Sequence, residues 1–266
     1  MSRLDRLFAE LKGRPALIPF VMGGDPDAVG SGALLEAAAA AGDILEVGVP
    51  FSDPIADGPT IQRAAQRALA GGATLAGVLD LVRRVTQTSE RPVVLLTYLN
   101  PIVQRGVERF CRDARQAGVD GVVVPDLPAD EADFLIGPAR EADLDTIFLV
   151  APTTSESRIG MAGERSRGFV YCVSLTGVTG ARAEVPPELE ALVKRVKAST
   201  PRPVCVGFGI STPAHAAAVG RLADGVIVGS ALVDLVEKSS RAAPAAVEDL
   251  LKQMGEALSQ IRHPAC

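Results

Sequence analysis

Three carboxylates lie close together in one short segment, "LEVGVPFSDPIADGPTIQ" from Leu45 to Gln62. Glu46 falls inside an apolar run that is typical of a β-strand, whereas Asp53 and Asp57 fall in a loop rich in proline and glycine. Because carboxyl groups serve as general acids and bases, this segment is a candidate for proton-transfer chemistry. For the two aspartates, turn formation is an equally good explanation.

Strand alternation separates Glu46 from its apolar neighbours. Ile44, Glu46 and Gly48 fall on one face of the predicted strand, and Leu45 and Val47 on the other. The structural alternative is an inward glutamate held by an ion pair, but no lysine or arginine falls in any predicted strand run. A carboxyl group without a cation in apolar surroundings has a raised pKa. The pattern therefore favours Glu46 as a general acid over a structural role.

Strand-like and helix-like segments alternate along the chain, and eight of the segments are short runs rich in β-branched residues. Eight such units in about 250 residues predict an α/β fold of the closed (β/α)8 TIM barrel type. An open doubly wound sheet is the alternative, but the first strand–helix turn, "GGDPDA", lacks the G-x-G-x-x-G fingerprint. We predict one barrel domain over residues 1–266, with an extra N-terminal helix ("SRLDRLFAELK") and an extra helix after strand 2 ("TIQRAAQRALAGG"). The predicted strand runs begin at Ala16, Ile44, Pro92, Gly121, Asp145, Phe169, Pro203 and Gly225.

Composition limits the classes of function. The net charge of −5 argues against binding to nucleic acid or to an anionic membrane. Apolar stretches shorter than the ~20 residues of a membrane span, and no secretory apolar region near the first residues, predict a cytoplasmic protein. With only His215 and His263, and cysteines that form no CxxC pair, we expect no metal site; a magnesium site built only from carboxylates is the weaker alternative. Since no lysine falls on a strand, Schiff-base chemistry is also excluded, which leaves cofactor-free acid–base work.

The ends of the last three predicted strands carry glycines, in "TGVTGA", "GFGIST" and "VGSAL". Each could be an ordinary turn, but barrels of this type hold phosphate at these strand ends, and Ser230 is predicted as the N-cap of a short helix there. Residues 177–187 are either a lid that closes on the ligand or an exposed loop. Aromatic residues toward strand ends could line an apolar pocket or fill the core: Phe20, Tyr98, Tyr171 and Phe208.

Six motifs resemble the tryptophan synthase alpha subunit family, and they occur in the order that the family shows. They are "LEVGVPFSDPIADGPTIQ", "LLTYLNPI", "VPDLP", "YCVSLTGVTGAR", "GFGIST" and "DGVIVGSAL". The resemblance implies a barrel that splits indole-3-glycerol phosphate into indole and glyceraldehyde 3-phosphate by a retro-aldol reaction. It further implies that Glu46 protonates indole C3 and that Asp57 accepts the ring N–H. The substrate-binding positions it implies are Phe20, Leu96, Tyr171 and Phe208 for the indole, Gly180, Gly209, Gly229 and Ser230 for the phosphate, and Thr179 on the lid.

The same resemblance implies a partner, the pyridoxal-phosphate beta subunit, which receives the indole in an alpha2-beta2 complex. Pyridoxal phosphate is expected on that partner only, and no cofactor on this chain. Three alternatives stay open: a stand-alone indole-releasing lyase, an isomerase of another sugar phosphate that uses Glu46 as a base, and a non-catalytic barrel that binds a phosphometabolite. The positions that resemble contacts with the partner are Asp53, Asn100, Asp126 and Pro128.

Overall fold

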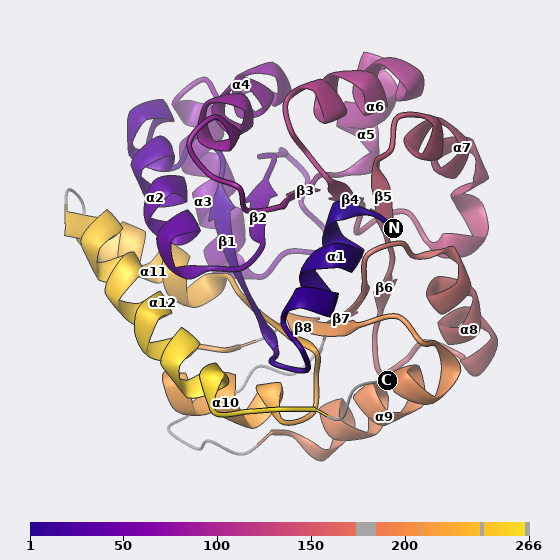
Figure 1. Ribbon diagram of the computed structural model, residues 1–266. Coiled ribbons are helices and arrows are strands. Elements are labelled where there is room, and N and C mark those ends of the chain that lie inside the picture. Colours follow the sequence, from indigo (N-terminus) through magenta and orange to yellow (C-terminus); the bar gives the residue numbers. More distant parts are fainter. Residues whose placement is uncertain (174–184, 208, 240–241, 264–266) are drawn as a thin grey trace.

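The protein is a ring of parallel strands surrounded by helices, as Figure 1 shows from the end at which the N-terminal helix lies. This computed structural model describes residues 1–173, 185–207, 209–239 and 242–263. Within these residues one sheet contains nine strands in the order β5-β4-β3-β2-β1-β9-β8-β7-β6, and every pairing in it is parallel. The predicted (β/α)8 barrel is therefore confirmed.

The strands are short, and helices follow them on the outside of the ring. The strands are β1 (Ala16–Met22), β2 (Leu45–Gly48), β3 (Val93–Leu96), β4 (Gly121–Val123), β5 (Asp145–Ile147), β6 (Leu149–Val150), β7 (Val170–Val173), β8 (Val204–Gly207) and β9 (Gly225–Val228). The helices are α1 (Arg3–Glu10), α2 (Ala28–Ala41), α3 (Pro59–Ala70), α4 (Leu75–Thr86), α5 (Leu99–Arg105), α6 (Val107–Gln116), α7 (Asp133–Glu141), α8 (Glu156–Arg165), α9 (Pro187–Ser199), α10 (Pro213–Gly220), α11 (Ser230–Ser239) and α12 (Ala243–Ser259), with a 3-10 turn at Ala129–Glu131.

One predicted strand is interrupted. The run that begins at Asp145 forms two strands, β5 and β6, which are separated by Phe148 and stand at the two ends of the strand order. The Phe148 N–H leaves the ladder and donates to the Ser166 hydroxyl at 3.1 Å, which breaks the strand at this residue. Because β5 pairs with β4 and β6 pairs with β7, this single residue joins the ends of the sheet. The expectation of one continuous fifth strand is corrected to two half-strands.

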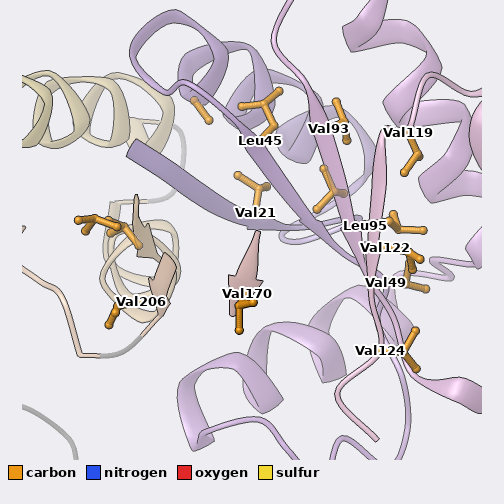
Figure 2. Packing of buried hydrophobic residues seen from close by; sticks show 14 of the residues in the cluster. Val21, Leu45, Val49, Val93, Leu95, Val119, Val122, Val124, Val170 and Val206 are labelled. Atoms are coloured by element: carbon orange, nitrogen blue, oxygen red, sulfur yellow. The ribbon is translucent and has the colours of Figure 1, made fainter. Parts of the chain in front are cut away.

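Alternating side chains divide the core into two layers. The larger layer lies between the strands and the helices, and Figure 2 shows part of it around β1 to β4, with Val21, Leu45 and Leu95 among its members. The smaller layer fills the barrel interior and includes Ile18 and Ile44. Leu45 and Ile44 are neighbours in the sequence and belong to opposite layers, which confirms the face assignment on which the orientation of Glu46 depends.

Both extra helices are present. α1 lies across the N-terminal end of the barrel (Figure 1), and its Leu4 is buried in the interior layer. A capping box at Ser2 and Asp5 begins this helix. α3 follows β2 and is buried through three alanines, Ala64, Ala65 and Ala68. Among the described helices none is long and apolar enough to cross a membrane.

Candidate active site

A cavity of about 350 Å³ opens at the carboxyl ends of the strands. Its walls come from β1, β2, β3, β6, β7, β8 and β9, from the loop after β2, and from the starts of α3 and α11. This is the end of the barrel at which the sequence placed the chemistry. Eight of the predicted site residues line the cavity: Glu46, Asp57, Phe20, Leu96, Tyr171, Gly209, Gly229 and Ser230.

Glu46 is the most buried titratable group in the cavity wall, with 1% of the residue exposed. It sits in β2 between Phe20 of β1 and Val94 of β3. Within the described ranges its Oε1 has no hydrogen-bond partner and no cation forms an ion pair with it. Burial, and secondly the charge of Asp57, raise the pKa of Glu46 to about 8. The carboxyl group is therefore protonated at neutral pH, as the sequence predicted for a general acid.

Asp57 approaches the same cavity from the loop after β2 and is half-buried. Burial raises its pKa to about 6, and a hydrogen bond from the Tyr98 hydroxyl partly offsets that rise. The same Tyr98 hydroxyl accepts the Ala56 N–H at 3.1 Å, and its ring stacks on Phe51 at 5.2 Å between centroids. Tyr98 therefore holds the loop after β2 in place. Of the two roles open for this aromatic residue, the packed one is observed.

The environments of the two carboxyl groups raise their pKa values to different extents. Glu46 retains its proton at neutral pH, while most Asp57 side chains have lost theirs. A protonated acid and an ionised acceptor facing one cavity are the arrangement needed to donate a proton at one atom and to stabilise positive charge at another.

Two strand glycines make room for the aromatic walls. A Cβ on Gly48 would lie 2.6 Å from Cζ of Phe20, and a Cβ on Gly207 would lie 2.4 Å from the Tyr171 hydroxyl. The two rings therefore pack closely over these glycines and give the cavity apolar sides. Sequence reasoning missed three further apolar wall residues, Ile61, Leu149 and Ile227. The alternation of β6 and β9 could have identified the last two as inward-facing.

The glycine turns after β8 and β9 also line the cavity. Gly209 has φ of +55°, a left-handed conformation that favours glycine. The Gly229 carbonyl accepts the Val233 N–H at 3.1 Å, which makes Gly229 the N-cap of α11 and Ser230 its first helical residue. The prediction of Ser230 as the N-cap is therefore wrong by one position. Its N–H and hydroxyl belong to the first helical turn, a place suited to an anion.

Seven predicted site residues are not among the described residues that line the cavity. Thr179, Gly180 and Phe208, and most of the 177–187 segment, fall outside the described residues. Asn100 and Asp53 are exposed on the rim. The remaining rim residues are Asp126, which is half-buried, and Pro128, which is exposed.

Asp53, Asp126 and Pro128 come from the loops after β2 and β4, and Asn100 lies in the first turn of α5, which follows β3. These three strands are adjacent. Asp126 accepts the Leu99 N–H at 2.9 Å and thereby caps α5 from the next loop. Sequence reasoning missed two exposed apolar residues near these positions in the chain, Ile55 and Val103, at 82% and 53% exposure. In the described ranges no group of three or more His, Cys, Asp or Glu side chains is placed to hold a metal ion.

Comparison with known proteins assigns the chain to a family. The family model described as tryptophan synthase alpha chain matches residues 8–262. The tryptophan synthase alpha chain of Gluconacetobacter diazotrophicus is 52% identical over 258 residues, 96% of this chain and 94% of the relative. The crystal structure of tryptophan synthase subunit alpha from Legionella pneumophila str. Paris matches with a TM-score of 0.90 at 40% identity, over 98% of this chain and all of the other.

A structure of the tryptophan synthase a2b2 complex from Pyrococcus furiosus, described in terms of mutual activation, matches with a TM-score of 0.88 at 40% identity, over 91% of this chain and 98% of the other. Sequence and fold therefore agree over nearly the full length of the chain. The chain belongs to the tryptophan synthase alpha chain family.

Proposed function

We propose that this protein cleaves indole-3-glycerol phosphate into indole and glyceraldehyde 3-phosphate by a cofactor-free retro-aldol reaction. The observation that carries the proposal is the pair of carboxyl groups in one cavity, Glu46 with a pKa of about 8 and Asp57 with a pKa of about 6. The reaction needs a proton donor at indole C3 and a negative group near the ring nitrogen, and these two residues supply one each.

The reaction steps follow from these protonation states. The Glu46 carboxylic acid donates its proton to indole C3, and the Asp57 carboxylate accepts the ring N–H, which becomes more acidic as positive charge develops. The adjacent glycerol hydroxyl then loses its proton, the carbon–carbon bond to C3 breaks, and its electron pair returns to the ring. Glu46, now a carboxylate, takes up the hydroxyl proton and regains its starting state. Indole and the aldehyde are released.

The shape of the cavity supports this substrate. Phe20, Leu96 and Tyr171 provide apolar walls for a flat ring on the side of the carboxyl groups. The glycine turns at Gly209 and Gly229, with Ser230 beginning α11, provide backbone N–H groups for the phosphate. A substrate with an aromatic ring at one end and a phosphate at the other spans these two ends.

A beta subunit that carries pyridoxal phosphate is the proposed partner, in an alpha2-beta2 complex, and this chain itself is proposed to need no cofactor. The related structure from Pyrococcus furiosus is that of a tryptophan synthase a2b2 complex. Asp53, Asn100 and Pro128 are exposed on adjacent segments of the rim and supply the proposed contact surface. Asp126, in the loop after β4, accepts the Leu99 N–H at the start of α5 and so connects two of these segments. Ile55, 82% exposed, adds an apolar contact to that surface.

The test is release of indole from indole-3-glycerol phosphate by the wild type, Glu46→Gln and Asp57→Asn, each with and without a beta subunit. We expect Glu46→Gln to lose at least ~10²-fold in rate because it cannot donate a proton. Large activation by the partner supports the alpha-subunit function. High activity without the partner would favour the stand-alone lyase, and no indole from the wild type would contradict the proposal.

A further inference from the structure

Two helices begin at the cavity and also pack on each other. α3 starts at Pro59, directly after Asp57 and Gly58, and α11 starts at Ser230, directly after Gly229. α3 packs against both β1 and α11. The placement of α3 relative to α11 therefore sets the distance between the Asp57 carboxylate and the glycine turn at the phosphate end.

The apolar contact between these elements does not fix that placement well. α3 presents Ala64, Ala65 and Ala68 to a small cluster that contains Phe20 and Val233. Alanine side chains allow close approach, but they form only shallow ridges and interlock poorly with a facing helix. α3 is also the extra helix of the fold, so the ring of barrel helices does not define its position.

Ion pairs on the polar side of α3 fix its position relative to α11. Arg67 binds Asp25, in the loop after β1, through two parallel contacts of 2.8 Å, and Asp25 is only 2% exposed. Arg63 binds Glu237 of α11 at 3.0 Å and lies 3.7 Å from Asp234 of the same helix. Arg67 also lies 3.8 Å from Glu237, so one carboxylate faces both arginines. The paired contacts of a guanidinium with a carboxylate are directional, and they therefore set the axial position of a helix.

We infer that Arg63, Arg67, Asp25 and Glu237 are positioning residues, which hold α3 against α11 so that Asp57 and Ser230 face the two ends of one substrate. They act through the helices and touch no reacting atom. The inference rests on the proposed function for the identity of that substrate. It predicts that disturbing the array changes both phosphate affinity and turnover, although every member lies outside the cavity wall.

The variant that tests this is Glu237→Lys, which places a cation opposite both arginines on a partly exposed side chain. The matched control is Glu156→Lys, because Glu156 binds Arg195 at 2.6 Å between α8 and α9, and none of their residues lines the cavity. Three quantities are measured for each protein: the affinity for inorganic phosphate, kcat and KM for indole release, and the thermal unfolding midpoint.

We expect Glu237→Lys to weaken phosphate binding about tenfold and to lower kcat as well, because misplacement by a fraction of an ångström is felt at both ends of the substrate. Glu237→Gln, which removes the charge without reversing it, should lie between the wild type and Glu237→Lys. Glu156→Lys should lose similar thermal stability and leave phosphate affinity and kcat within twofold of the wild type.

The inference is overturned if Glu237→Lys matches Glu156→Lys in phosphate affinity and in kcat. That outcome is separate from failure of the proposed function. If the wild type binds phosphate but releases no indole, while Glu237→Lys weakens phosphate binding, the proposed reaction is wrong and the positioning array stands.

Discussion

Glu46, at the C-terminal end of the barrel, and three aspartates at its N-terminal end lie in opposite electrostatic environments. At the N-terminal end, an aspartate one or two positions before a strand pairs with a cation and also accepts an N–H from the neighbouring strand. Asp43 does so with Arg14 at 2.7 Å and the Leu17 N–H at 2.8 Å. Asp120 and Asp224 repeat the arrangement before β4 and β9. At the C-terminal end, no cation in the described structure pairs with Glu46.

This difference shows that some carboxyl groups of the fold serve stability and another serves the reaction. A carboxylate that is paired with a cation and accepts a backbone N–H ties adjacent strands together. A carboxyl group that is buried without a cation keeps its proton and can donate it. Its burial lowers the stability of the folded state. The three aspartates therefore contribute to holding the ring closed, and Glu46 is left free to react.

The largest expected effect is on how stability depends on pH. In the unfolded chain Glu46 ionises near 4.5, whereas in the folded protein its pKa is about 8. The folded state binds this proton more tightly than the unfolded chain. The stability that this difference contributes is therefore fully present below pH 4.5 and is lost as the pH rises through 8. Relative to wild type, Glu46→Gln should gain up to roughly 5 kcal/mol in free energy of unfolding between pH 4.5 and 9. Urea unfolding at several pH values measures this difference. If the free energy of unfolding had the same pH dependence in the two proteins, the pKa of Glu46 would not be raised in the folded state.

Asp120 provides the opposite test at the other end. Asp120→Asn leaves the Arg3 and Arg115 guanidinium groups without their shared carboxylate. Because Asp120 is buried but the two arginine side chains are 32% and 38% exposed, we expect a loss of about 2 kcal/mol in the free energy of unfolding. Turnover of the folded variant at saturating substrate should stay near that of the wild type. The control is Asp80→Asn, which removes an exposed pair and should change stability by less than about 1 kcal/mol; an equal effect of the two variants would contradict the comparison.

The sequence predicted one end of the barrel better than the other. The inward orientation of Glu46 follows from local alternation, and its lack of a strand cation follows from composition. The pairing of Asp43 with Arg14 joins residues 29 positions apart, and no local pattern indicates it. The break at Phe148 depends on the Ser166 hydroxyl, and the hold of Tyr98 on Asp57 depends on the placement of two loops. Contacts between separate segments decide these features, so periodicity alone could not predict them.

The dependence of rate on pH sharpens the comparison within the site. Activity needs Asp57 ionised, which is lost below about 6, and Glu46 protonated, which is lost above about 8. We expect a bell-shaped profile of kcat/KM, with about tenfold loss per pH unit beyond each limb. Because the groups interact, the two apparent values belong to the pair. Indole release followed across this range measures the profile, and a maximum well above pH 8 would contradict Glu46 as the acid.

The smallest expected effect concerns the residue that holds the second carboxylate in place. In Tyr98→Phe the ring remains stacked on Phe51, but Asp57 loses its hydrogen-bond donor and Ala56 its acceptor. Since that hydrogen bond lowers the pKa of Asp57, its removal should move the acid limb of the profile upward and reduce kcat several-fold, by about 1 kcal/mol. The basic limb should move less than the acid limb, because burial is the larger cause of the raised pKa of Glu46. Phe51→Leu, which removes the stacking and retains the hydroxyl, is the control and should leave the acid limb in place; if both variants shift it equally, packing of the loop, and not the hydrogen bond, sets the ionisation of Asp57.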